Sequence, residues 1–124
     1  MALNRARRLV YNSWSATPPE NPMELVIFAR FHARQGREHE VAAALCDVVG
    51  PSRAEPGCLF IQAYRAVREP PLFYVHSRWK DEAAFDIHAG LPHTQRFVQQ
   101  VEPLIDHPLE VARMRALEAL PTGG

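Results

Sequence analysis

The chain has 124 residues, 47% of them hydrophobic and 23% charged, with a formal net charge of zero. This length supports one domain with a core of its own, which needs no disulfide or metal to hold it together. The balanced charge argues against nucleic acid as a partner, because no basic stripe follows the few arginines near the N-terminus. No apolar run reaches membrane-spanning length, and no hydrophobic segment typical of a secretory signal follows those arginines. We therefore expect a cytoplasmic protein that does not bind a membrane.

The two ends of the chain differ in composition from its middle. Residues 1–22 become rich in Pro and small polar residues and follow neither the helical nor the strand period. We interpret them as an N-terminal extension, either disordered or anchored on a partner subunit through aromatic residues such as Trp14. Residues 118–124 are expected to be a frayed tail. The folded domain is therefore predicted to span residues 23–117.

The first half of the domain predicts a strand, a helix and a second strand. Residues 23–31 are nearly all apolar, which is typical of a central strand covered on both faces. Residues 37–52 place apolar side chains on one side and charged ones on the other, which predicts a helix ended by Gly50-Pro51. A turn at Glu55-Pro56-Gly57 leads into a strand over residues 58–66.

The second half predicts a strand, two helices and a last strand. Residues 72–79 are rich in aromatic and β-branched side chains and form the third strand. A helix follows over residues 81–90, with acidic residues at its start and glycine at its end. Pro92 fits the first position of a further helix, in which Phe97 belongs to the buried stripe. The last strand is expected over residues 109–117.

This order predicts an α+β fold, the ferredoxin-like β-α-β-β-α-β unit with a four-stranded antiparallel sheet. One face of the sheet packs on the helices, and the other carries apolar and aromatic side chains that nothing in the chain covers. An exposed patch of this kind is typical of an interface, and a homodimer packed sheet against sheet is the simplest solution. On the third strand His76 and Arg78 would face the partner, paired with acidic residues across the two-fold axis.

Four segments of the chain resemble one known family. Glu24 to Phe31, Glu55 to Leu59, Arg78 to Phe85 and His88 to His93 look like the antibiotic biosynthesis monooxygenase (ABM) domain, a dimeric α+β barrel. The most specific parts are the Arg-Trp-x-x-x-x-Ala-x-x-x-His arrangement and the Pro-His that follows it. The resemblance covers residues 23–117, nearly all of the chain outside the extension.

The resemblance implies a range of activities. The family includes cofactor-independent monooxygenases of phenolic or quinol-like compounds, isomerases of small molecules, and haem-degrading enzymes. The haem-degrading branch carries an asparagine in the first strand, where this chain has Ala29 and Arg30, so no haem is expected. Two further positions differ from the family: Ser77 stands where glutamate is common, and Ile61 where tyrosine is common.

His88 is the first candidate for a catalytic group. The resemblance places it at the family's site histidine, and an imidazole that titrates near neutral pH can remove a proton from an acidic phenol or activated C–H. The alternative is a structural histidine that caps the end of its helix or bonds the extension. Trp79, the family's site tryptophan, is expected to line the cavity roof, stack on a planar substrate and donate its indole N–H to a developing oxyanion. Its alternative is a large core residue.

Around these two groups, we expect an apolar substrate site without a metal or cofactor. The expected substrate-binding residues are Ser77, Ile61, Phe85, Phe97 and His93. A solvent-facing position at the helix start is the alternative for His93. His88 and His93 lack the i, i+4 spacing of a helical zinc site, and neither a third ligand nor a cysteine motif accompanies them.

Three functions remain open from the sequence. The first is a cofactor-independent monooxygenase that uses dioxygen to oxidise a small electron-rich phenolic or quinol-like substrate. The second is an isomerase on the same fold, in which His88 moves a proton between carbons. The third is a dimeric binding domain without activity, whose pocket is filled by Phe60, Ile61 and Phe97, and the residues at positions 61 and 77 favour this third reading.

Overall fold

A computed structural model describes residues 23–117, with a compact unit from Met23 to Arg115. Residues 1–22 and 118–124, which were interpreted as an N-terminal extension and a frayed tail, lie outside the described residues. None of the described helices is long and apolar enough to cross a membrane. The elements in chain order are β2 (Leu25–His32), α2 (Glu38–Arg53), β3 (Cys58–Arg65), β4 (Leu72–Trp79), α3 (Glu82–Gly90), α4 (Pro92–Val101), the 3-10 helix η1 (Glu102–Leu104) and β5 (Glu110–Met114).

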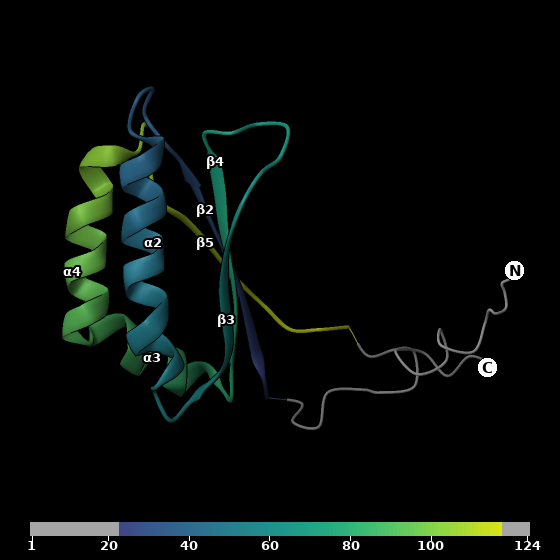
Figure 1. Ribbon diagram of the computed structural model, residues 1–124. Helices are drawn as coiled ribbons and strands as arrows, with labels where there is room; N and C mark the ends of the chain where they lie inside the picture. The colour runs from purple at the N-terminus through teal and green to yellow at the C-terminus, as the bar shows by residue number, and fades with distance from the viewer. Residues whose placement is uncertain (1–22, 118–124) are drawn as a thin grey trace, which may run out of the picture. The chain divides into compact units, whose positions relative to one another are not determined.

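The four strands form one antiparallel sheet in the order β3-β4-β2-β5, and the helices lie on one side of it (Figure 1). This arrangement is the ferredoxin-like α+β fold that the pattern predicted. β2 is central, as its apolar sequence indicated, and β5 is a short edge strand that ends before the predicted limit at residue 117. In this register, Ser77 of β4 lies between Ile27 of β2 and Ile61 of β3.

The two faces of the sheet differ in burial. β4 alternates as predicted, with Phe73, Val75, Ser77 and Trp79 buried on the helix side. Side chains of the other face are only partly buried, and Phe28 is 40% exposed. The prediction that the first strand is covered on both faces is therefore not met within the described chain, because no described element packs on this open face.

α2 continues through Gly50-Pro51 to Arg53, which corrects the prediction that this pair ends the helix. Pro51 has no N–H and so loses one helical hydrogen bond, and because it falls in the last turn few helical hydrogen bonds follow it. Ser52 is fully buried and donates its hydroxyl to the carbonyl of Val48 at 2.7 Å. This last turn places Ser52 in the lining of the cavity under the sheet and leads into the loop that carries Glu55.

That loop packs closely against the start of α3. Asp81 caps this helix, since its carboxylate accepts a hydrogen bond from the Ala84 N–H at 2.8 Å. A Cβ added at Gly57 would lie 2.5 Å from the Cβ of Ala84, so only glycine fits at this approach. The Gly57 carbonyl also accepts from Lys80 N at 3.0 Å. The contact fixes the position of Glu55 relative to α3.

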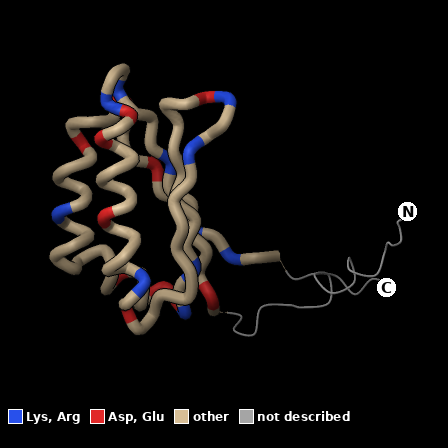
Figure 2. Tube along the Cα trace, viewed as in Figure 1, with Lys and Arg blue, Asp and Glu red and all other residues tan. Residues whose placement is uncertain are grey.

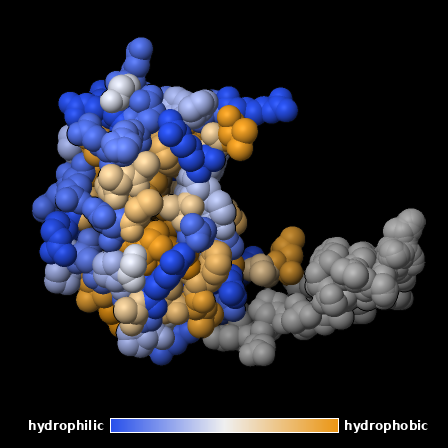
Figure 3. Space-filling model, in the orientation of Figure 1, coloured by the Kyte–Doolittle hydropathy of each residue, from blue (hydrophilic) through white to orange (hydrophobic). Residues whose placement is uncertain are grey.

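The surface of the described domain is mixed in charge. Positive and negative residues are interspersed along the helices and loops of the described chain, in keeping with the zero net charge (Figure 2). In the side view of Figure 3, hydrophilic residues predominate over the helices, and apolar residues gather in the middle of the domain.

Candidate active site

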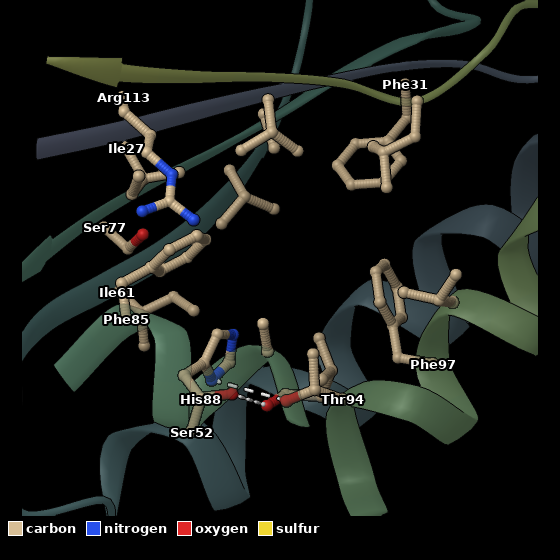
Figure 4. A pocket seen from close by; sticks show the side chains of 17 residues that line it. Ile27, Phe31, Ser52, Ile61, Ser77, Phe85, His88, Thr94, Phe97 and Arg113 are labelled. Carbon is tan, nitrogen blue, oxygen red and sulfur yellow. Dashed lines mark hydrogen bonds between the residues drawn. The ribbon is translucent and has the colours of Figure 1, made fainter. Parts of the chain in front are cut away.

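A cavity of about 360 Å³ lies between the helix-facing side of the sheet and the helices. Its lining is mostly apolar, and the polar side chains that reach it are few. In Figure 4 the rings of Phe31 and Phe97 lie on one side, and Ser77, Phe85 and Arg113 on the other. A cavity of this size, apolar with a few convergent polar groups, is typical of a small-molecule site.

The base of the cavity is formed by His88, in the last turn of α3. Its Nδ1 lies 2.7 Å from Oε2 of Glu55, in a pair whose side chains are only 11% and 8% exposed. Thr94 of α4 lies next to it, with Oγ1 3.4 Å from the same nitrogen. An ionised carboxylate can only accept a hydrogen bond, so the proton of the His88 ring lies on Nδ1. Nε2, on the other edge of the ring, then carries a free lone pair. Figure 4 shows that edge directed into the cavity.

His93 reaches the same carboxylate from the first turn of α4. Its Nε2 lies 2.7 Å from Oε2 of Glu55, and its side chain is 18% exposed. His93 is therefore not the solvent-facing residue of the alternative interpretation. His93 also lies outside the cavity lining, so its side chain does not reach a molecule bound in the cavity. One oxygen of Glu55 thus holds two imidazoles from two helices.

Trp79 is fully buried and lies outside the cavity lining, so the expectation that it forms the cavity roof is corrected. Its indole N–H donates to Oγ of Ser77 at 3.0 Å and is not available to a substrate oxyanion. The ring packs 4.5 Å from the ring of His88 and 5.7 Å from that of Phe85. Trp79 therefore supports the site from behind, holding both Ser77 and His88.

Arg113 of β5 lies at the edge of the cavity. Its guanidinium stands 4.9 Å from the centre of the Phe85 ring, and its two terminal nitrogens reach Glu82 at 3.2 Å and Asp86 at 2.9 Å. The hydrogen bond to Asp86 raises the pKa of Arg113 above its usual range. These contacts tie the edge strand to α3 across the cavity.

Of the predicted substrate-binding residues, Ser77, Ile61, Phe85 and Phe97 all line the cavity. Phe60 does not fill it, because its ring packs against His76 on the open face. The sequence reasoning missed three contributors to the site, namely Glu55, Thr94 and Arg113. Glu55 was interpreted only as part of a turn, and the single signal available was its place in a segment that resembles the family.

Two groups in the described chain have the composition of a metal site. Glu55, His88 and His93 place their ligand atoms within 4.8 Å of one another, as do His32, Asp106 and His107 at the surface. Glu55 completes this group of three possible ligands, and the sequence reasoning did not find it. Both imidazoles lie at hydrogen-bond distance from the same carboxylate oxygen, an arrangement that can hold His88 as a hydrogen-bonded base.

On the open face of the sheet, the ion pair of Arg78 differs from the predicted one. Arg78 forms an ion pair with Glu24 of its own chain at 2.7 Å, where the sequence reasoning expected a partner across a two-fold axis. His76 stacks on Phe28 with ring centres 4.9 Å apart. Burial, together with the nearby Arg78, lowers the pKa of His76.

The class of protein is now defined: a ferredoxin-like α+β domain with an apolar cavity and an imidazole held by a buried carboxylate. The family described as antibiotic biosynthesis monooxygenase matches residues 24–100. The chain belongs to this family, as the resemblance indicated.

Individual proteins are similar to this chain as well. A Bacillus subtilis protein named "Putative monooxygenase YcnE" is 31% identical over 76% of this chain and 99% of its own length. The "Uncharacterized protein sll1783" of Synechocystis is 28% identical over 70% of this chain, which spans only 59% of that protein. The solved structure of Rv0793 from Mycobacterium tuberculosis is 27% identical with a TM-score of 0.73, over 78% of this chain and 98% of that one.

Proposed function

We propose that the protein is a cofactor-independent monooxygenase that oxidises a small, electron-rich phenolic or quinol-like substrate with dioxygen. The observation that carries this proposal is the Glu55–His88 pair, buried at 2.7 Å beneath an apolar cavity. A base held in this way, with its free nitrogen toward the cavity, can remove a proton from a bound hydroxyl group. Glu55 then stabilises the imidazolium that forms, as the buried carboxylate of a catalytic triad does.

The rest of the reaction needs no metal or flavin, because the ionised substrate is itself the reductant. The substrate anion passes one electron to dioxygen, and the resulting radical and superoxide combine to form a C–O bond. The hydroperoxide then loses water and leaves a carbonyl on the ring. One oxygen atom enters the product, the other becomes water, and the substrate supplies the two electrons and two protons that this water requires.

Oxygen uptake by the purified protein, with a panel of quinols, anthrones and catechols, tests this proposal. We expect uptake that needs no added cofactor, incorporation of one atom of labelled dioxygen into the product, and loss of both in His88→Ala. Proton exchange on a carbonyl compound without oxygen uptake would instead identify an isomerase. Neither oxygen uptake nor proton exchange would indicate a binding domain without activity. Either of these two results overturns the oxygenase proposal.

We propose further that the protein is a homodimer joined through the open face of the sheet. Large apolar side chains remain exposed there in the single chain, including Phe28 at 40%, Tyr64 at 48% and Met114 at 44%. Such a patch is self-complementary around a two-fold axis. Sedimentation of the wild type should give twice the chain mass, and Phe28→Glu should give a folded monomer. A wild-type monomer at micromolar concentration would overturn the dimer.

A further inference from the structure

Ser77 is a polar group of the cavity whose hydrogen bonding is incomplete. Ser77 is 2% exposed, and within the described chain its hydroxyl accepts one hydrogen bond, from Trp79, and donates none. Two other polar side chains of the lining have complete pairings. Ser52 donates to a carbonyl of its own helix, and Arg113 pairs with two acidic residues of α3. A buried hydroxyl proton without an acceptor costs free energy, so an acceptor is expected to enter the cavity.

Three features make this hydroxyl a directed donor. The indole N–H of Trp79 occupies one lone pair of Ser77 and polarises its O–H bond, as in other chains of hydrogen bonds. The register places Ser77 between Ile27 and Ile61, so the bond forms in apolar surroundings where it is stronger than in water. Ser77 belongs to the cavity lining, and Figure 4 shows its oxygen on the side of the cavity where Arg113 and Phe85 lie.

The base and this donor are held by the same side chain. Trp79 packs 4.5 Å from the His88 ring and bonds Ser77, so it sets both groups against one cavity. His88 offers a lone pair and Ser77 offers a proton that is not transferred. These two groups match a substrate hydroxyl group that ionises. Its proton needs an acceptor, and its oxygen, once charged, needs a hydrogen-bond donor.

We propose that Ser77 is the oxyanion donor of the site, which binds the oxygen of a phenol-type hydroxyl as His88 removes its proton. The substrate O–H bond breaks with both electrons left on oxygen, and an N–H bond forms at Nε2 of His88. Ser77 keeps its proton and shortens its hydrogen bond to the charged oxygen. The inference rests on the proposed function in taking the cavity as the substrate site, but its test requires no turnover.

The probe is 4-nitrophenol, whose ionised form is measured by its visible absorbance. In the wild type we expect bound 4-nitrophenol to ionise at lower pH than free 4-nitrophenol. Ser77→Ala should weaken the affinity for the ionised form about 10- to 100-fold, the range for hydrogen bonds to charged groups, and shift the bound ionisation back toward the free value. Trp79→Phe should give a smaller shift in the same direction. Tyr74→Phe, which removes a hydroxyl from the open face of the same strand, is the matched control.

Ser77→Ala also leaves the indole N–H without an acceptor, so the double variant Ser77→Ala/Trp79→Phe is measured beside it. Ser77→Thr, which retains the hydroxyl, should restore binding of the ionised form. Probe binding that depends on His88 but is equal in the wild type and Ser77→Ala overturns the inference alone. No binding to the wild type overturns both proposals. Binding that depends on Ser77, without oxygen uptake from any substrate, supports the donor and overturns the oxygenase.

Discussion

Oε2 of Glu55 lies 2.7 Å from Nδ1 of His88, although the two residues are 33 positions apart in the chain and belong to different elements. The contact determines which nitrogen of the imidazole carries the proton and which faces the cavity. In the proposed reaction Glu55 is thus a positioning residue, which acts on the substrate only through His88.

The first prediction concerns that contact. Glu55→Gln should lower kcat about 100-fold, within the usual contribution of a general base, and leave KM within about twofold. The amide keeps the size of the side chain but cannot stabilise a charged imidazolium. Oxygen uptake at saturating substrate measures the change. Glu40→Gln on the exposed face of α2 serves as control. A Glu55→Gln variant with a raised KM and an unchanged kcat would show that Glu55 acts only on substrate binding.

The second prediction concerns metals. Treatment with a chelator should leave oxygen uptake unchanged, because the base is held by hydrogen bonds. Excess Zn²⁺ should inhibit, since it competes for the same atoms of Glu55, His88 and His93. His93→Gln should weaken that inhibition, whereas His107→Gln in the surface group should not. Activity that disappears with the chelator and returns with one metal would contradict a cofactor-free reaction.

The close approach at Gly57 gives the third prediction. Gly57→Ala should lower the free energy of unfolding by about 1–3 kcal/mol, the usual cost of overpacking, because the new methyl group would meet Ala84 at 2.5 Å. It should also lower kcat, since the loop carries Glu55. Urea unfolding measures the first effect. The double variant with Ala84→Gly should recover kcat.

Gly50 provides the control for that experiment. A Cβ added there meets nothing within 4 Å outside its own helix backbone and its two chain neighbours, and the residue lies inside α2. Gly50→Ala should therefore change the free energy of unfolding by less than about 1 kcal/mol, because the entropy that alanine saves in a helix is opposed by the crowding of its Cβ against the ring of Pro51. Equal destabilisation at both positions would show that the approach to Ala84 is not the cause.

The sequence predicted the elements of this fold because their signals are local. Alternation along β4, the acidic start of α3 and the proline of α4 each lie within one element, and every predicted strand and helix is present. The prediction that Gly50-Pro51 ends α2 was wrong, because a proline in the last helical turn and a proline just beyond it look alike in sequence. The difference depends on Ser52, which is buried against the sheet.

The site could be predicted only in part, for a related reason. His88, Phe85 and Ser77 belong to one continuous segment, so the pattern and the family resemblance both reached them. Glu55 joins them only because the Gly57 loop packs on α3, a contact between segments that periodicity does not describe. For Trp79 a cavity position and a core position were both open, and the structure agrees with the core position, since an aromatic residue at a strand end looks the same in sequence whether its ring lines a cavity or lies behind it.

The fourth prediction follows from the lowered pKa of His76. The unfolded chain binds a proton at this residue more readily than the folded one, so stability from His76 is fully present above its unfolded pKa of about 6.5 and is lost as the pH falls through the folded pKa. His76→Gln should therefore lose less stability between pH 8 and pH 5 than the wild type. Urea unfolding at fixed protein concentration measures this, with exposed His39→Gln as control. Equal losses in all three would contradict it.

The last prediction concerns Arg113 at the edge of the cavity. Arg113→Met should raise KM several-fold with kcat nearly unchanged, because the guanidinium holds Phe85 and α3 over the cavity without touching the base. The free energy of unfolding should change by less than about 1 kcal/mol, since the ion pairs are exposed. Salt gives an independent readout, because screening weakens exposed pairs. KM of the wild type should rise with ionic strength, while KM of Arg113→Met should not. Arg37→Met is the matched control, and a variant whose KM equals that of the wild type at every salt concentration would show that the strand contact has no part in substrate binding.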